Sequence, residues 1–256
     1  MDDLKKTIER TKNYARIYGQ KLNDEQLFLR LISPKIYRFI QIKGKGTKKT
    51  DRSDWQNKFS KAKLLTEKYL INMKGILMVA VTGSVAAEFA FKNEDIDLLI
   101  VTKNNELWWW RLYLRFFIWW HKIPHRKFGK SEIANDFCFN LWLDEDNLAI
   151  PRQKRNLKNA ADLIMMKVIM EKNGTYDKFL KNNYWVNKYL ATGYEERMKI
   201  SRKIDKKINS KNKNSLMKVI NKILFKGQCW YMQVINKQKL NKGEINFGQA
   251  FFHKNS

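Results

Sequence analysis

A glycine-serine pair and two aspartates in the middle of this 256-residue chain have the types and spacing needed to bind a phosphate together with a metal ion. Gly83-Ser84 follows an apolar run, and Asp95 and Asp97 begin the next one. Glycine lets the backbone approach a phosphate closely, and the amides of a following helix start, with the Ser84 hydroxyl, can donate hydrogen bonds to it. Residues two apart in a strand share a face, so Asp95 and Asp97 should project together. Two carboxylates opposite a phosphate cradle are the arrangement that magnesium-assisted phosphoryl chemistry requires.

The segment that carries these residues resembles the DNA polymerase beta nucleotidyltransferase superfamily. In that superfamily a Gly-Ser turn and a short helix precede an Asp-x-Asp pair on an apolar strand, and here Asp95 follows Ser84 by eleven positions. The stretch from about residue 55 to 190 is also similar to uncharacterised bacterial nucleotidyltransferase-domain proteins. Those proteins share a tryptophan-containing helix like the one at Leu107-Trp108 and an Asn-Leu-Trp-Leu-Asp strand like residues 140–144.

This resemblance implies transfer of a nucleoside monophosphate from a nucleoside triphosphate, such as ATP, to an acceptor hydroxyl. It also implies that Gly83 and Ser84 hold the β and γ phosphates and that Asp95 and Asp97 bind Mg²⁺. The superfamily normally has a third acid on a neighbouring strand, and Asn140 occupies that position here. Asparagine can offer a neutral oxygen to a metal but cannot accept a proton as a base. We therefore expect Asp95 and Asp97 to bind one Mg²⁺, and a second Mg²⁺ position to lack its acidic ligand because Asn140 replaces it.

Arg111 and Arg115 are further candidates for phosphate binding. They are one helical turn apart in the tryptophan-rich segment and so share a face of the predicted helix. Guanidinium groups bind phosphate oxygens in pairs, which predicts contact with the triphosphate or with an acceptor. In the alternative interpretation, their aliphatic stems cover the edge of an apolar core and their charged ends reach solvent.

Two other functions and one purely structural interpretation stay open. The same fold could bind nucleotide or RNA with weakened catalysis, because Asn140 replaces an acid. A minimal nucleotidyltransferase could also act as an antitoxin that modifies a partner toxin or RNA. In the structural interpretation, Gly83-Ser84 is a tight turn into a helix, and Asp95 and Asp97 are a solvated strand edge.

The elements that must position these residues predict an α+β fold with a small mixed sheet. We expect an N-terminal helical extension over residues 1–52, a nucleotidyltransferase core over 53–150 and a helical C-terminal region over 151–256. Within the core, apolar runs predict strands over residues 76–82, 96–102 and 136–143, and the first of them is rich in valine. Beyond Pro151, apolar residues at helical spacing, such as Leu157, Ile164 and Val168, predict helices only.

The composition favours a basic cytoplasmic protein with a polyanionic partner. The formal net charge of +26 attracts phosphates, in a nucleotide, in RNA or DNA, or on an anionic membrane surface, although an AT-rich genome would also favour lysine. The two cysteines cannot build a disulfide framework, and the chain opens on a polar, lysine-rich stretch. The tryptophan-rich residues 107–123 are too short and too basic to span a bilayer, which predicts a buried or partly buried helix. Peripheral membrane contact through these tryptophans is the weaker alternative, and the oligomeric state is open.

Overall fold

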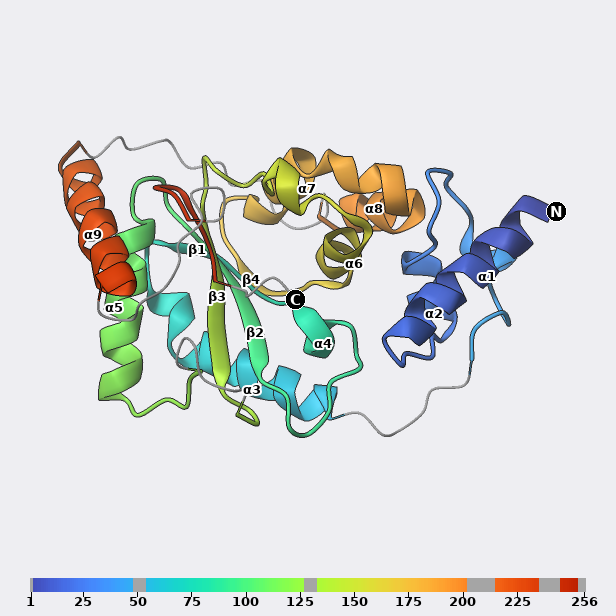
Figure 1. The fold of residues 1–256 in the computed structure, drawn as a ribbon, viewed down its shortest axis with the longest axis horizontal. Coiled ribbons are helices and arrows are strands. Elements are labelled where there is room, and N and C mark those ends of the chain that lie inside the picture. Colours follow the sequence, from blue (N-terminus) through green and yellow to red (C-terminus); the bar gives the residue numbers. More distant parts are fainter. Residues whose placement is uncertain (1, 48–53, 127–132, 202–214, 235–244, 253–256) are drawn as a thin grey trace.

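One five-stranded sheet lies between two groups of helices (Figure 1). This computed structural model describes residues 2–47, 54–126, 133–201, 215–234 and 245–252. The strands, in the order β4-β1-β2-β3-β5, are β1 (Ile76–Val81), β2 (Ile96–Thr102), β3 (Phe137–Asp144), β4 (Lys167–Glu171) and β5 (Gln249–Phe251). Strands β2 and β3 run parallel, and the other neighbouring pairs are antiparallel. The predicted α+β class with a mixed sheet is confirmed.

The helices form a layer on each face of the sheet and a third group at one end. They are α1 (Asp2–Ile17), α2 (Asp24–Leu29), α3 (Trp55–Lys68), α4 (Gly83–Ala86), α5 (Leu107–Trp120), α6 (Leu157–Met165), α7 (Thr175–Asn182), α8 (Asn187–Ser201) and α9 (Ser215–Val234). Short 3₁₀ turns occur at Phe39–Gln41, Leu70–Asn72, Arg152–Lys154 and Tyr184–Val186. Helices α3, α5 and α9 pack on one face, and α6, α7 and α8 pack on the other. Figure 1 places α1 and α2 at the end opposite α5 and α9.

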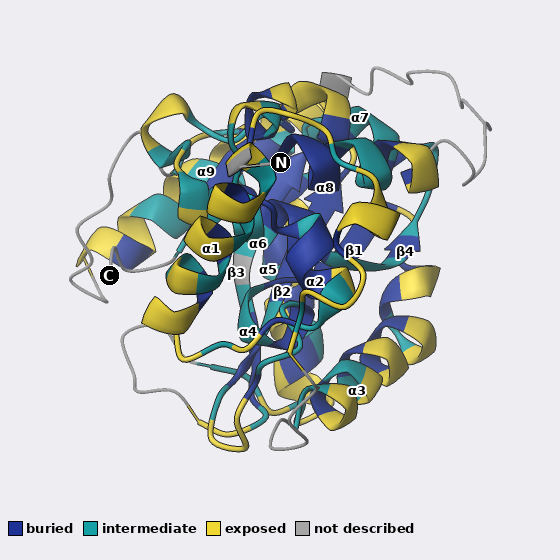
Figure 2. Ribbon diagram, turned by 90° about the vertical axis from the view of Figure 1, so that its right-hand side faces the viewer, coloured by how far each residue is buried: buried dark blue, intermediate teal, exposed yellow. Residues whose placement is uncertain are grey.

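Alternation along β2 explains how one short strand serves both layers. Ile96, Leu98 and Ile100 pack into the core formed with α3, α5 and α9. Leu99 and Val101 pack into the core formed with α6, α7 and α8. Because successive side chains of a strand point to opposite faces, the side chain of Asp97 belongs to the α6–α8 face. Figure 2 shows the strands as deeply buried and α3 with an exposed outer side.

The N-terminal helices have a small core of their own, which includes Leu27, Phe28 and Leu31. They also support the short helix α4, because Arg30 Nη2 donates to the carbonyl of Ala87 at 3.1 Å. The helical prediction for this region is confirmed over α1 and α2. Residues 48–53, and with them the predicted boundary of the N-terminal extension, lie outside the described residues.

The prediction of a purely helical C-terminal region is wrong, because two of the five strands come from it. Helix α6 ends at Met165, and the β-branched pair Val168-Ile169 continues as β4. Strand β4 pairs with β1, and β5 pairs with β3, so the predicted core and C-terminal region share one sheet. The hydrogen-bonding partners of both strands lie far away in the sequence, and local periodicity contains no information about them.

The tryptophan-rich segment is helix α5, as predicted, and it contributes Trp108, Leu114 and Ile118 to the core. Among the described residues, we find no helix whose length and apolar character would let it cross a membrane.

A carboxylate is buried where β2 and β3 end. Asp144 is fully buried, and its Oδ1 accepts hydrogen bonds from Asn147 Nδ2 at 2.7 Å and from the amide of Asp146 at 3.1 Å. Its Oδ2 has no hydrogen-bond partner among the described residues. Burial raises the pKa of Asp144 to about 6, although the hydrogen bonds from Asn147 and Asp146 oppose the shift.

We predict that Asp144 destabilises the fold increasingly as the pH rises from about 4 to about 6. In that range the carboxyl ionises in the unfolded chain while it stays protonated in the folded protein. Asp144→Asn keeps an oxygen acceptor and cannot ionise. The difference in free energy of unfolding between Asp144→Asn and wild type should therefore increase in favour of the variant from pH about 4 to about 6. The increase should be at most about 3 kcal/mol, and the difference should be constant above that pH. Urea denaturation at several pH values measures this difference, and a difference independent of pH would contradict the assignment.

Candidate functional site

The carboxylate of Asp97 lies directly against the backbone of Gly83. Gly83 has φ +64°, in the left-handed region, and a Cβ added there would lie 2.6 Å from Asp97 Oδ2. The amide of Thr82 donates to the carbonyl of Asp97 at 3.0 Å, so the end of β1 is also bonded to β2. A side chain at position 83 would therefore be strained and would collide with the carboxylate. The structure brings together the turn and the second aspartate of the predicted pair.

Asp95, Asp97 and Cys138 form a group that could hold a metal ion. One candidate ligand atom from each lies within 4.8 Å of those of the other two. Asp95 and Cys138 are buried, and Asp97 is half-buried. Burial, and then the charges of Asp97 and Asp95, raise the pKa of the Cys138 thiol far above its usual range, so the thiol stays protonated at neutral pH. The two predicted aspartates thus converge, and the third side chain that faces them is a thiol.

Cys138 reaches this position through the pairing of β2 with β3. Asp97 pairs with Cys138, but Leu99 pairs with Leu141, because β3 has an irregularity between these points. Such a bulge changes which side chains of the strand share a face. Asn140, the predicted counterpart of the third acid, lies in β3 within this irregular stretch, and its side chain lies outside the described residues. Alternation puts Cys138 on the same predicted face as Asn140, two residues away, but it does not indicate that Cys138 is the residue paired with Asp97.

Two basic side chains hold Asp95 and the segment before it. Arg126 Nη1 forms an ion pair with Asp95 Oδ2 at 2.9 Å. The buried Lys58 of α3 donates from Nζ to the carbonyl of Glu94 at 2.6 Å and to that of Lys92 at 3.1 Å. These contacts fix the entry to β2 and partly neutralise the buried carboxylate. Neither Arg126 nor Lys58 can be recognised from the sequence as a partner of this segment, because neither shows a spacing relationship to Asp95.

A cavity of about 490 Å³ opens beside Gly83, Ser84 and Asp97. Its lining also includes polar side chains from the turn before α6 and from α6 itself, among them Lys154 and Lys158. The hydroxyl oxygen of Thr82, which also lines the cavity, is buried and has no hydrogen-bond partner among the described residues. The rest of the lining is mostly apolar and includes Leu99, Leu141, Leu163, Met166, Phe179 and Phe251. The turn therefore borders a volume typical of small-molecule sites.

Arg111 and Arg115 do not lie at this cavity. Arg111 is buried between α5 and α9, where it donates to Gln228 Oε1 and lies 4.3 Å from the ring centre of Phe252. Burial, and then the charge of Arg115, lowers the pKa of Arg111. Arg115 is exposed on α5. Because α5 covers the face of the sheet opposite to Asp97, neither guanidinium is brought to the site.

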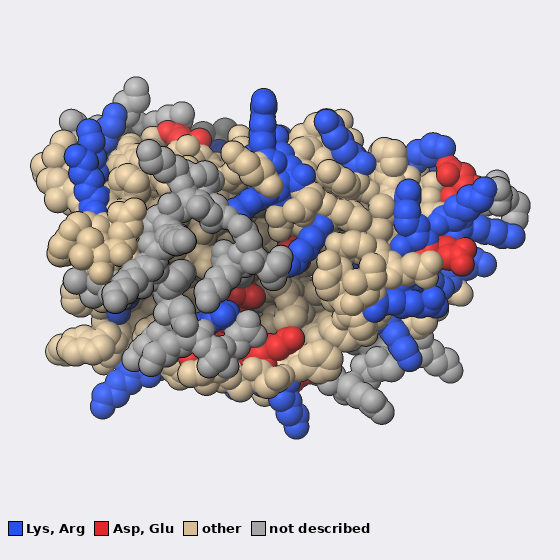
Figure 3. All heavy atoms as spheres, viewed as in Figure 1, with Lys and Arg blue, Asp and Glu red and all other residues tan. Residues whose placement is uncertain are grey.

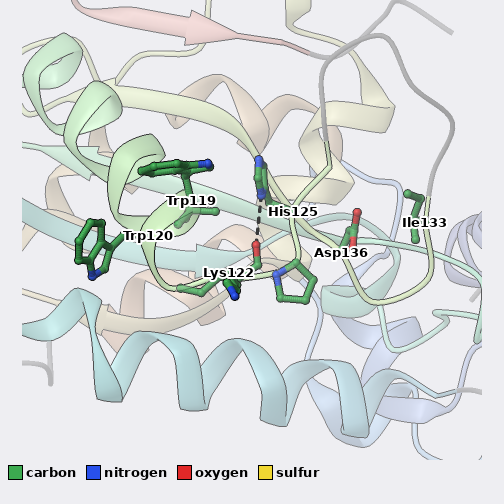
Figure 4. A pocket seen from close by; sticks show the side chains of 9 residues that line it. Trp119, Trp120, Lys122, His125, Ile133 and Asp136 are labelled. Atoms are coloured by element: carbon green, nitrogen blue, oxygen red, sulfur yellow. Dashed lines mark hydrogen bonds between the residues drawn. The ribbon is translucent and has the colours of Figure 1, made fainter.

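A larger cavity, of about 680 Å³, lies at the C-terminal end of α5 (Figure 4). Trp119, Trp120, His125 and Asp136 are among its lining residues. His125 Nδ1 is hydrogen-bonded to the carbonyl of Ile123 at 3.1 Å. The two aspartates and Gly83 do not line this cavity.

Comparison with family models, with curated proteins and with solved structures finds no significant match to this chain. The geometry of the site is therefore the basis for any functional conclusion.

We predict that Gly83→Ala both destabilises the fold and disrupts the carboxylate site. The substitution forces a side chain into the left-handed region and against Asp97 Oδ2. The free energy of unfolding should fall by about 2 kcal/mol or more. Chemical denaturation measures the loss.

Gly227→Ala is the matched control, since Gly227 lies within α9 and a Cβ there would meet nothing within 4 Å. That variant should gain about 0.5–1 kcal/mol, because alanine favours the helix. Equal effects of the two substitutions would show that the contact between Gly83 and Asp97 is not a constraint.

Proposed function

We propose that this chain is a Mg²⁺-dependent nucleotidyltransferase that moves a nucleoside monophosphate from a nucleoside triphosphate to an acceptor hydroxyl. The observation that carries the proposal is the contact between Asp97 and Gly83 at the mouth of a cavity, with Asp95 beside it. The resemblance of the Gly-Ser and Asp-x-Asp motifs to the DNA polymerase beta superfamily supports the same conclusion.

The donor atoms at the site fit a divalent cation bound by oxygen. Mg²⁺ in proteins is usually held by one or two carboxylates and completes its shell with water and substrate phosphates. Asp95 and Asp97 would supply the carboxylates. The sulfur of Cys138 is a soft atom and a poor ligand for so hard an ion. Mg²⁺ held there would neutralise charge on the phosphates.

The cavity supplies the remaining contacts that a nucleoside triphosphate needs. Thr82, Gly83 and Ser84 line the cavity beside Asp97, and the Thr82 hydroxyl has no hydrogen-bond partner among the described residues. Lys154 and Lys158, which line the same cavity, would balance the phosphate charge. Basic side chains are also spread over the face shown in Figure 3 and gather over the N-terminal helices, which would favour a polyanionic acceptor such as RNA.

In the transfer step, the acceptor oxygen attacks the α phosphorus, and the bond from that phosphorus to the β-phosphate oxygen breaks. Pyrophosphate leaves, and the proton of the acceptor hydroxyl passes to solvent water. No third carboxylate joins Asp95 and Asp97 in the described part of this cluster, where Cys138 stands instead. A protonated thiol cannot act as the base. We therefore expect slow turnover.

The second candidate is nucleotide or RNA binding without turnover, favoured by the thiol that faces the two aspartates. Incubation with each labelled triphosphate, Mg²⁺ and total RNA or lysate separates the candidates. Transfer of label supports the enzyme, and Mg²⁺-dependent binding without transfer across these acceptors supports the binding protein.

We predict that Asp97→Asn lowers Mg²⁺-dependent pyrophosphate release by at least about 100-fold, because an amide binds the cation weakly. Asp144→Asn, the same change at the other end of the β2–β3 pair, should retain wild-type release. An Asp95→Asn/Asp97→Asn protein that released pyrophosphate as fast as wild type would rule out the assignment.

We predict that Cys138→Asp raises the affinity for Mg²⁺, since it adds a third hard anionic oxygen beside Asp95 and Asp97. Without metal, repulsion among three carboxylates should lower the free energy of unfolding. Isothermal titration with Mg²⁺ and urea denaturation with and without it measure the two opposite effects. Cys138→Ser, which adds no charge, is the control, and equal behaviour of both variants would contradict the metal assignment.

A further inference from the structure

We propose that helices α5 and α9 form a face that binds the surface of an anionic membrane. The two helices lie side by side at one end of the molecule, at the left of Figure 1. Together they present aromatic and aliphatic side chains to solvent. This lipid-facing surface, called the α5–α9 face below, lies apart from the cavity at Gly83 and does not depend on the proposed nucleotidyltransferase activity.

Helix α9 turns an apolar stripe away from the protein core. Leu216, Val219, Ile223, Trp230 and Val234 recur at helical spacing and are all exposed, with Ile223 at 64% and Trp230 at 60%. A stripe of this kind normally faces a core. In the described part of the chain, the stripe of α9 is exposed to solvent instead. Exposed apolar surface of this kind marks an interaction site.

The opposite side of α9 fixes this orientation through hydrogen bonds to α5. The fully buried Asn221 Oδ1 accepts from the amides of Trp108 at 2.8 Å and Trp109 at 3.2 Å. Gln228 Nε2 donates to the carbonyl of Trp108 at 2.7 Å and Gln228 Oε1 accepts from Arg111. Rotation of α9 to bury its stripe would break these bonds and leave buried polar groups without partners. The apolar stripe is therefore held outward.

Helix α5 adds an aromatic stripe to the same end of the molecule. Trp109, Tyr113, Phe116 and Trp120 recur at helical spacing and are exposed. Trp119, also exposed, lines the cavity at the C-terminal end of α5 together with Trp120, Lys122 and His125 (Figure 4). Tryptophan and tyrosine side chains favour the boundary between lipid headgroups and hydrocarbon.

The charge of the two helices selects an anionic surface. Neither α5 nor α9 contains an aspartate or glutamate. Lys218, Lys222 and Lys226 recur every four residues and form an exposed row along one flank of the α9 stripe, and Arg115 is exposed on α5. Apolar residues beside a basic row are characteristic of helices that lie in the interface of anionic bilayers.

Two other occupants fit this face less well. Single-stranded RNA would stack on the aromatic rings, but the aliphatic side chains of Leu216, Val219 and Ile223 offer no surface for stacking. A protein partner would be expected to avoid lysine near the contact, since protein interfaces are depleted in lysine. A bilayer accepts aliphatic, aromatic and basic groups together.

The test is flotation of the whole protein with vesicles of phosphatidylcholine alone or mixed with phosphatidylglycerol. We expect binding to the mixed vesicles that weakens as salt is raised, and little binding to phosphatidylcholine alone. Lys218→Gln/Lys222→Gln/Lys226→Gln should weaken binding by roughly 100-fold at low ionic strength. Lys43→Gln/Lys45→Gln/Lys68→Gln removes the same charge from exposed lysines elsewhere and should bind nearly as well as wild type.

A second pair of variants tests the apolar contribution. Ile223→Ser/Trp230→Ser should lose at least ten-fold in binding, whereas Ile40→Ser/Leu64→Ser, at similarly exposed positions, should not. Thermal unfolding followed by circular dichroism verifies that each variant is folded. Failure of wild type to float with mixed vesicles, or equal binding by test and control variants, would overturn the proposal. The proposal would also be overturned if the α9 substitutions disrupted a dimer or an RNA complex of this protein and left vesicle binding unchanged.

Discussion

The close approach of the Asp97 carboxylate to the backbone of Gly83 is the constraint around which the centre of the molecule is arranged. A residue with a Cβ would collide with Oδ2, so the Asp97 carboxylate can occupy this place beside the turn only because position 83 is glycine. The contact lies where β1 ends and α4 begins. It also places a carboxylate at the opening of the cavity, so the same constraint serves both the fold and the proposed chemistry.

Much of this centre could be predicted from the sequence because its elements are local. The order of strand, Gly83-Ser84 turn, short helix and second strand follows from apolar runs and one glycine within about twenty residues. Alternation along a strand was sufficient to place Asp95 and Asp97 together. The apolar face of α3 is likewise local, because it follows from residues at helical spacing. Its members Ala62 and Leu65 are buried, and Trp55 and Phe59 pack against the same core.

What could not be predicted depends on contacts between distant segments. Cys138 faces the aspartates because it pairs with Asp97 across β2 and β3, and the register of that pairing leaves no mark in the residue pattern. Arg126 reaches Asp95 from a loop, and Lys58 reaches the preceding segment from a helix much earlier in the chain. Arginine is a common phosphate ligand, but Arg111 lies on α5, on the face of the sheet opposite to Asp97. There it donates a hydrogen bond to Gln228.

The pairing of β5 with β3 has a consequence for synthesis in the cell. The amide of Asp144 donates to the carbonyl of Gly248, and Leu141 to Leu143 pair with residues 249–251. While the ribosome is still translating the segments in between, the outer edge of β3 has no strand beside it, and its backbone groups are open to other nascent chains. Chaperone protection over that interval would matter more for this protein than for one whose neighbouring strands emerge in succession.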